Sequence, residues 1–157
     1  MRKRGLVKTG GSKTRTTLRR PIEILMVEDN VGDAILLKET LKSSKFLTNL
    51  EVIRDGKTAM EYLEKISLSG KIGLPDIILL DLNLPKKDGH EVLLEIKRSR
   101  RLSAIPVIVF TNSDQDEDRW KAYRVHADAY LLKPGQLFQY GALLNYLEEH
   151  WLKDICL

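Results

Sequence analysis

Short unbroken runs of apolar residues alternate along this chain with stretches of helical periodicity. Three such runs lie at residues 77–80, 107–110 and 129–132, and a fourth run at residues 22–27 is interrupted only by Glu23. Runs of this length indicate strands that are buried on both faces, the usual state of strands in a parallel sheet. A further strand at residues 50–54 alternates apolar and polar positions and is expected at an edge of that sheet.

The segments between these strands place apolar residues at the spacing of amphipathic helices. The expected helices cover about residues 32–44, 57–70, 88–98, 114–127 and 136–153. Five strands and five helices in strict alternation predict a doubly wound α/β domain with a five-stranded parallel sheet. A chain of 157 residues has room for one such domain.

The fourth helix carries one more specific prediction. Ser113 and Asp116 have the spacing of a capping box, so the helix is expected to begin there. Trp120, Tyr123 and Ala127 then lie at helical spacing along it.

Charge is unevenly distributed and divides the chain near residue 20. Residues 1–20 hold eight Lys or Arg and no acidic residue, whereas residues 21–157 hold 18 basic and 22 acidic ones. The first segment has too few apolar residues to offset the entropy of ordering, so residues 1–20 are predicted to be a disordered basic tail. Such a tail could attract nucleic acid or anionic lipid, but a solvated extension is the simpler interpretation. Residues 21–153 then form the domain and 154–157 its C-terminal end.

Two compositional features indicate a cytoplasmic protein. Cys156 is the single cysteine, which excludes a disulfide framework and is typical of a reducing compartment. No segment approaches the length of about 18 apolar residues that a membrane-spanning helix needs.

Polar residues follow directly after four of the expected strands. Glu28 and Asp29 come after the first, Asp81 after the third, Thr111 ends the fourth and Lys133 follows the fifth. Because the carboxyl ends of parallel strands share one sheet edge, these side chains should meet where open α/β sheets bind ligands. Clustered carboxylates repel one another unless a cation joins them, and Mg²⁺ is the expected ion for oxygen ligands.

This set of residues suits a phosphoryl group. Asp81 can attack phosphorus while Mg²⁺ and Lys133 offset the charge on the equatorial oxygens, and Thr111 can donate a hydrogen bond to one of them. Each residue alone has an ordinary structural explanation, such as a solvated turn or an edge lysine. The agreement of four strand ends is the argument for a phosphoryl site.

The motifs Glu28-Asp29, Asp81, Thr111 and Lys133-Pro134, in this order, resemble the CheY-like receiver domain of two-component response regulators. The resemblance covers residues 21–151. The strings at 27–34, 81–89 and 148–152 are similar to the stand-alone response regulators that serve cyanobacterial and bacterial phytochromes. The resemblance to receiver domains implies a flavodoxin-like sheet with the strand order 2-1-3-4-5.

The resemblance also implies a mechanism. Asp81 would accept a phosphoryl group from the phosphohistidine of a sensor histidine kinase, of the phytochrome type in this subgroup. Mg²⁺ would be held by Glu28, Asp29, Asp81 and the backbone carbonyl of Asn83. Thr111 and Lys133 would contact the phosphoryl oxygens. Such a protein is not an enzyme beyond its own phosphorylation and dephosphorylation.

Further residues acquire roles through the same resemblance. Tyr130 and Thr111 match the switch pair of the family, and Lys133-Pro134 is expected to be a cis peptide. Asn83 and Asn112 flank the site and would modulate access to the phosphoryl group. Glu28 departs from the commoner Asp of the family, and Val31 from the Pro of the subgroup.

The signal is expected to leave through a surface, since the chain ends with the fifth helix and no nucleic-acid-binding domain follows it. The fourth helix, fifth strand and fifth helix carry many large apolar residues, which predicts a homodimer through this face. These residues are Trp120, Tyr123, Phe138, Tyr140, Tyr146, Trp151, Leu152 and Ile155. His90, His126 and His150 are scattered and are expected at the surface.

Three other functions fit less well. A phosphatase of the haloacid dehalogenase type needs a second Asp where this chain has Asn83. Such a phosphatase also places its nucleophile on the first strand, whereas Asp81 follows the third. A flavodoxin-like mononucleotide binder needs a phosphate cradle where this chain has an acidic loop. A phosphorylation-independent interaction module would act through the basic tail.

Overall fold

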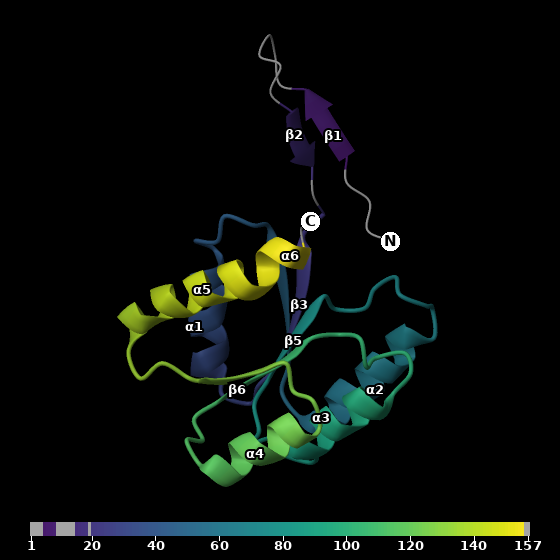
Figure 1. Cartoon of the computed structure of the whole chain (residues 1–157), viewed down its shortest axis with the longest axis vertical. Helices are drawn as coiled ribbons and strands as arrows, with labels where there is room; N and C mark the ends of the chain where they lie inside the picture. Colours follow the sequence, from purple (N-terminus) through teal and green to yellow (C-terminus); the bar gives the residue numbers. More distant parts are fainter. Residues whose placement is uncertain (1–4, 9–14, 19, 156–157) are drawn as a thin grey trace.

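Five parallel strands form the centre of the body in the computed structural model, which describes residues 5–8, 15–18 and 20–155 (Figure 1). They are β3 (Ile22–Val27), β4 (Thr48–Ile53), β5 (Ile77–Leu80), β6 (Val107–Thr111) and β7 (Ala129–Leu132). Their order in the sheet is β4-β3-β5-β6-β7, which confirms the predicted order 2-1-3-4-5. Met26 pairs with Leu79, and Leu79 with Ile108, so the three central strands are in register at their buried middle.

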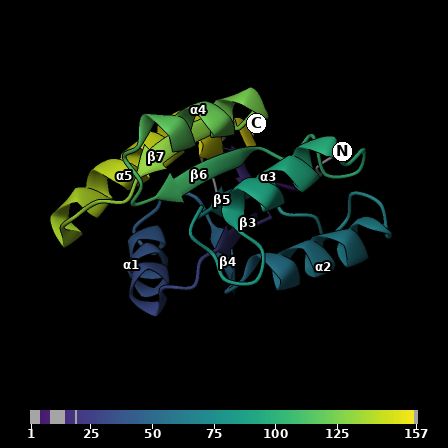
Figure 2. The ribbon, with the colours of Figure 1, turned by 90° about the horizontal axis from the view of Figure 1, so that it is seen from below.

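Helices cover both faces of the sheet (Figures 1 and 2). On one face, α1 (Val31–Leu41) and α5 (Tyr140–Leu147) pack against Ile24, Met26 and Ile108. On the other face lie α2 (Gly56–Ser67), α3 (Gly89–Arg98) and α4 (Asp116–Arg124). The apolar runs are therefore buried on both sides, which explains why three of the strands have no polar position in their middle.

Three helices begin directly after a strand or its loop, each with an N-cap side chain. Asn30 accepts a hydrogen bond from Asp33 N, Asp55 from Thr58 N and Asp88 from Glu91 N, at 2.7–3.1 Å. These caps satisfy backbone donors that would otherwise have no partner. They also fix where α1 and α3 start relative to the strand ends that carry the site.

The capping box predicted for the fourth helix was wrong. The helix begins at Asp116 after the N-cap residue Gln115, which provides no side-chain cap, and Ser113, two residues before Gln115, donates its hydroxyl to Asp118 Oδ2 at 2.5 Å. Its buried residue is Ala122, whereas Trp120 and Tyr123 are 61% and 49% exposed. A small residue at the contact lets α4 lie close to the sheet and leaves its aromatic residues outside.

The last helical segment is not one continuous helix as predicted. A 3₁₀ turn, η1 (Leu137–Gln139), precedes α5, and a π-helical turn, η2 (Glu148–Leu152), separates α5 from α6 (Lys153–Ile155). The buried Glu148 carboxylate accepts hydrogen bonds from Ser44 Oγ and Lys45 N at 2.8 and 2.9 Å. The π turn thus starts at a residue that ties the C-terminal helices to the loop after α1.

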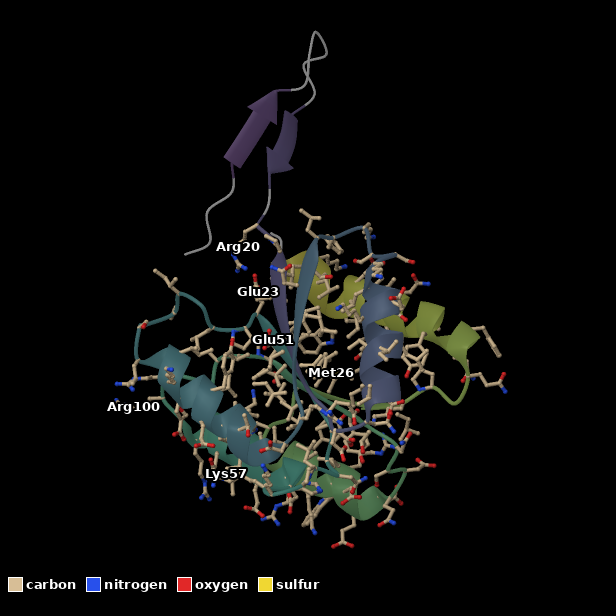
Figure 3. The ribbon with its side chains drawn as sticks, turned by 180° about the vertical axis from the view of Figure 1, so that it is seen from behind. Arg20, Glu23, Met26, Glu51, Lys57 and Arg100 are labelled. Carbon is tan, nitrogen blue, oxygen red and sulfur yellow. The ribbon has the colours of Figure 1, made fainter. Side chains whose placement is uncertain are left out.

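The N-terminal segment differs in part from the predicted tail. Within it, β1 (Gly5–Lys8) and β2 (Arg15–Leu18) pair as antiparallel strands outside the parallel sheet. Residues 1–4, 9–14 and 19 lie outside the described residues, as do 156–157 with the single cysteine. Arg20, assigned to the tail from the sequence, lies beside the start of β3 and pairs with Asp76 (Figure 3). None of the helices in the described parts of the chain is both long and apolar enough to cross a membrane.

Candidate functional site

The carboxyl edge of the sheet brings together the acidic residues predicted from the strand ends. Carboxylate oxygens of Glu28, Asp29 and Asp81 lie within 4.8 Å of one another. Glu28 and Asp81 are 1% and 5% exposed, whereas Asp29 is exposed at the rim. Strands β3 and β5 are neighbours in the sheet, which explains how residues more than fifty positions apart converge.

Lys133 lies at the centre of this cluster. Its Nζ is 2.6 Å from Glu28 Oε1, 2.8 Å from Asp33 Oδ2 and 3.1 Å from Asp81 Oδ2. The lysine side chain is almost fully buried, so its charge is compensated by these carboxylates and not by water. Its backbone N also donates to Thr111 O at 2.8 Å, which fixes the end of β7 against β6.

Burial and charge move the pKa values of this cluster. Burial raises the pKa of the Glu28 carboxyl to about 7, and the nearby Asp81 charge adds to the rise against the attraction of the Lys133 ammonium. Burial lowers the pKa of Lys133, but the hydrogen bond to Asp33, the close contact with Glu28 and the Asp81 charge outweigh it, so the net pKa is raised. Lys133 therefore remains an ammonium, and the Glu28 carboxyl holds a proton more readily than an ordinary glutamate does.

The donor set suits a hard divalent cation. Three carboxylates offer oxygen ligands to one point, and Mg²⁺ prefers such ligands. Glu28 Oε1 is buried and, although close to Lys133 Nζ, accepts no well-directed hydrogen bond. A buried carboxylate oxygen with spare acceptor capacity is an available ligand position, so the residues present fit a divalent ion.

Asp33 is a site residue that sequence reasoning missed. It lies in the first turn of α1 and contacts Lys133, exactly one hundred positions away in the sequence. An acidic residue in a first helical turn has an ordinary explanation in the helix dipole, so its type gave no separate signal. The signal that could have found it is its position five residues after Glu28, on the helix that follows the acidic strand end.

The two predicted switch residues are both buried. Thr111 is fully buried, and its Oγ1 accepts a hydrogen bond from Ser113 N at 3.4 Å. Tyr130 is 6% exposed, and its hydroxyl donates to Ser113 O at 2.9 Å. Ser113 therefore lies between the two, in the loop from β6 to α4.

The remaining predicted residues lie at the rim of the site or differ from expectation. Asn83 is exposed, and its backbone N donates to Asp81 Oδ1 at 3.3 Å; Asn112 is also exposed. The Lys133-Pro134 peptide is trans, because the described residues contain no cis peptide bond, and the expectation of a cis bond was wrong. The trans isomer is the intrinsically favoured one for a peptide bond before proline.

The apolar face predicted for dimerisation is only partly exposed. Trp120 and Tyr123 of α4, Leu132 of β7 and Phe138 before α5 are exposed. Other members of the predicted set, Tyr140 and Leu152, are buried in the core between α1, α5 and the sheet and do not contribute to an exposed surface.

Comparison with known proteins places these features in one family. The response regulator receiver domain matches residues 24–145. The chain is 45% identical over 132 residues to the probable methanogenesis regulatory protein FilR2 of Methanothrix harundinacea, covering 84% of each chain. It is 41% identical over 137 residues to the response regulator Rcp1 of Synechocystis, covering 87% of this chain and 93% of Rcp1.

Solved structures agree with the sequence relatives. The phosphorylated cyanobacterial phytochrome response regulator RcpA superposes with a TM-score of 0.78 at 40% identity, over 86% of this chain and 96% of RcpA. The Mn²⁺-bound form of Rcp1 superposes with a TM-score of 0.76 at 41% identity, over 85% of this chain and 96% of that chain. The fold, the acidic strand ends and these matches agree: the chain belongs to the response regulator receiver domain family of two-component signalling.

Proposed function

We propose that the protein is a phosphorylation-controlled response regulator whose phosphoacceptor is Asp81. The observation that carries the proposal is the position of Lys133 Nζ, within 3.1 Å of Asp81 and also in contact with Glu28 and Asp33. A buried ammonium beside the attacking carboxylate can neutralise an incoming phosphoryl oxygen.

The proposed reaction transfers a phosphoryl group from a histidine of a sensor kinase. A carboxylate oxygen of Asp81 forms a bond to phosphorus while the bond from phosphorus to the imidazole nitrogen breaks. The imidazole leaves with the electron pair of that bond. Lys133 would pair with a phosphoryl oxygen, and Thr111 would donate a hydrogen bond to another. Catalysis of this step and of the hydrolysis of the acyl phosphate, in which water attacks phosphorus and the Asp81 carboxylate leaves, is the only chemistry proposed for the chain.

Glu28, Asp29 and Asp81 would hold Mg²⁺, together with the backbone carbonyl of Asn83. When bound, the ion would supply positive charge to the phosphoryl oxygens and to the crowded carboxylates. The Mn²⁺-bound form of Rcp1 supports a divalent ion at such a site. Asn83 and Asn112, both exposed beside the site, would modulate how water reaches the acyl phosphate.

The test is phosphorylation of the purified protein by a small-molecule phosphodonor with Mg²⁺. The expected product carries one phosphoryl group by intact mass, and hydroxylamine releases it as expected for an acyl phosphate. Asp81→Asn should remain unlabelled, whereas Asp76→Asn is unsuitable as a control because it is buried in an ion pair. Asp88→Asn is the matched control, because Asn also caps helices and the site stays intact. Labelling of Asp81→Asn at the wild-type level would refute the assignment.

The proposed partner is a sensor histidine kinase in the cytoplasm. RcpA supports a phytochrome-type light sensor, since it is described as a phytochrome response regulator. FilR2, described as a methanogenesis regulatory protein, supports a different input. Phosphotransfer from a phytochrome kinase and from a kinase without a chromophore domain would separate the two, and the faster transfer identifies the input class.

The proposed output is a phosphorylation-dependent homodimer through the α4–β7–α5 face. Its exposed apolar residues are Trp120, Tyr123, Leu132 and Phe138, and large exposed apolar groups on one side of a small domain mark interaction surfaces. Tyr130 lies on the strand between these helices, so a change of its position would reach the same face. Sedimentation of the protein with and without phosphodonor tests this output.

A further inference from the structure

Four polar side chains form a continuous chain of contacts from α3 to the switch tyrosine. His90 Nε2 lies 3.0 Å from Asp118 Oδ1, and Asp118 Oδ2 accepts from Ser113 Oγ at 2.5 Å. Ser113 O then accepts from the Tyr130 hydroxyl at 2.9 Å. The contacts join α3, α4, the loop from β6 and strand β7, four elements that surround one side of the site.

Asp118 is an ionised acceptor at the centre of this chain. The hydrogen bond from Ser113, and after it the one from His90, hold the pKa of the Asp118 carboxyl below its usual range. An ionised carboxylate only accepts hydrogen bonds, so both His90 Nε2 and Ser113 Oγ must donate to it. This fixes the imidazole tautomer and the direction of the Ser113 hydroxyl.

Ser113 connects both switch residues. Its backbone N donates to Thr111 Oγ1 at 3.4 Å, and its carbonyl accepts from Tyr130, while its hydroxyl is held by Asp118. The loop that carries Ser113 therefore cannot shift without changing the hydrogen bonds of Thr111 and Tyr130. Arg119, one residue after Asp118, lies with its guanidinium 4.6 Å from the centre of the Tyr130 ring and adds a cation–π contact.

The other end of the chain is fixed to the phosphoacceptor strand. Gly89, which precedes His90, lies so close to this strand that an added Cβ would lie 2.2 Å from Asp81 O and 2.5 Å from Leu82 Cα. The start of α3, and with it the backbone of His90, is therefore set against the residue that would carry the phosphoryl group.

We infer that His90 and Asp118 are positioning residues for the switch: through Ser113 they hold Tyr130 in its buried orientation and set the balance between its buried and exposed states. The inference rests on the proposed switch function of Tyr130 and Thr111. Without the His90 donor, Asp118 would hold Ser113 less firmly, the Ser113 carbonyl would no longer be a fixed acceptor, and Tyr130 would turn outward more often.

The test follows Tyr130 directly, by ¹⁹F NMR of the protein with 3-fluorotyrosine and assignment through Tyr130→Phe. In wild type the Tyr130 resonance should be that of a buried ring. In His90→Ala the buried-to-exposed ratio should fall about tenfold, the effect of losing a hydrogen bond to a charged group. His90→Gln retains an N–H donor and should restore most of the wild-type signal.

Two further variants keep the test decisive. Ser113→Ala removes only the hydroxyl and should give the same shift as His90→Ala, with little added effect in the double variant because both act through Asp118. His150→Ala removes an exposed histidine in η2, the turn that follows α5, and should leave Tyr130 unchanged. An unchanged Tyr130 resonance in folded His90→Ala, or equal behaviour of the Ala and Gln variants, would overturn the inference.

These measurements are made on the unphosphorylated protein, so they do not depend on the phosphoacceptor assignment. Labelling of Asp81 by the phosphodonor is followed separately in the same variants. If wild type is not labelled but the Tyr130 resonance of His90→Ala changes as expected, only the proposed function is contradicted. If wild type is labelled and the Tyr130 resonance does not change in His90→Ala, only the positioning role is contradicted.

Discussion

Asp33 and Lys133 are one hundred positions apart in the sequence, yet the Asp33 carboxylate accepts a hydrogen bond from the Lys133 ammonium at 2.8 Å. The contact joins the first turn of α1 to the end of β7 across the mouth of the site. By holding the ammonium of Lys133 in place, Asp33 contributes to the site, although it is not expected to bind the metal.

Asp33→Asn should slow phosphorylation of Asp81. The neutral amide holds the ammonium less firmly, so Lys133 spends less time where it can meet a phosphoryl oxygen. We expect a decrease of about tenfold in the phosphodonor-dependent rate, the size of one charged hydrogen bond. Glu39→Gln removes an exposed ion pair of the same helix and should leave the rate unchanged. An Asp33→Asn rate equal to that of Glu39→Gln would contradict the role of Asp33.

Mg²⁺ binding should strengthen as the pH rises through about 7. Burial raises the pKa of Glu28 to about 7 in the metal-free protein, so a proton must leave before its carboxylate can bind the ion. Below this pH the apparent affinity should fall by up to about tenfold per pH unit. Mg²⁺ titrations between pH 6 and pH 8 measure the slope, and Glu28→Gln should flatten it.

The raised pKa of Glu28 also makes the free energy of unfolding depend on pH. Because the folded protein binds this proton more tightly than the unfolded chain, the contribution is fully present below the ordinary pKa of 4.5 and is lost as the pH rises to about 7. Thermal unfolding without metal should therefore show this contribution decreasing over that interval, and added Mg²⁺ should oppose the decrease at the upper end. If the free energy of unfolding of metal-free wild type, measured relative to Glu28→Gln, increased with pH over this interval, the raised pKa of Glu28 would be contradicted.

Gly89→Ala should destabilise the fold at the site itself. The new Cβ would lie 2.2 Å from Asp81 O, a backbone atom that cannot turn aside, so the start of α3 must move. We expect a loss of about 3 kcal/mol in the free energy of unfolding. Gly141→Ala is the matched control, because nothing lies within 4 Å of its added Cβ and alanine favours the helix by about 0.5 kcal/mol. Urea unfolding of the two variants measures the difference.

Trp120→Glu should prevent the proposed dimer. A charge at the centre of an apolar contact must be buried without a partner, so the dissociation constant of the phosphorylated protein should rise about thirtyfold or more. Leu68→Glu adds the same charge to a similarly exposed apolar site just after α2, outside the proposed α4–β7–α5 face. Equilibrium sedimentation that shows equal dimer in both variants would exclude the α4–β7–α5 face.

The acidic strand ends could be predicted from the sequence because they depend on short-range patterns. The run at Ile77–Leu80 has no polar face, so Asp81 can only lie at the strand end, and the parallel topology then brings it to Glu28. The observed strand order is the one that the resemblance to receiver domains implies. These conclusions need the order and direction of strands but no detail of side-chain packing.

What could not be predicted depends on how helices rotate about their axes. Whether Asp33 points at Lys133 is set by the packing of α1 against α5 and the sheet, and this cannot be read from its first turn alone. In α4 the small Ala122 is buried and the larger Trp120 is exposed, which depends on the rotation of the helix about its axis. Ser113 caps no helix because α4 begins only at Asp116, two residues beyond the start that the capping box predicts.

The ion pair of Arg20 and Asp76 joins the end of the basic segment to the parallel sheet. Asp76 is 3% exposed and accepts hydrogen bonds from Glu23 N and from both terminal nitrogens of Arg20, at 2.7–2.8 Å. Truncation through residue 20 would take a guanidinium away from a buried carboxylate and weaken the start of β3. Truncation through residue 19 keeps the pair, so only that shorter deletion measures what the basic segment does by itself.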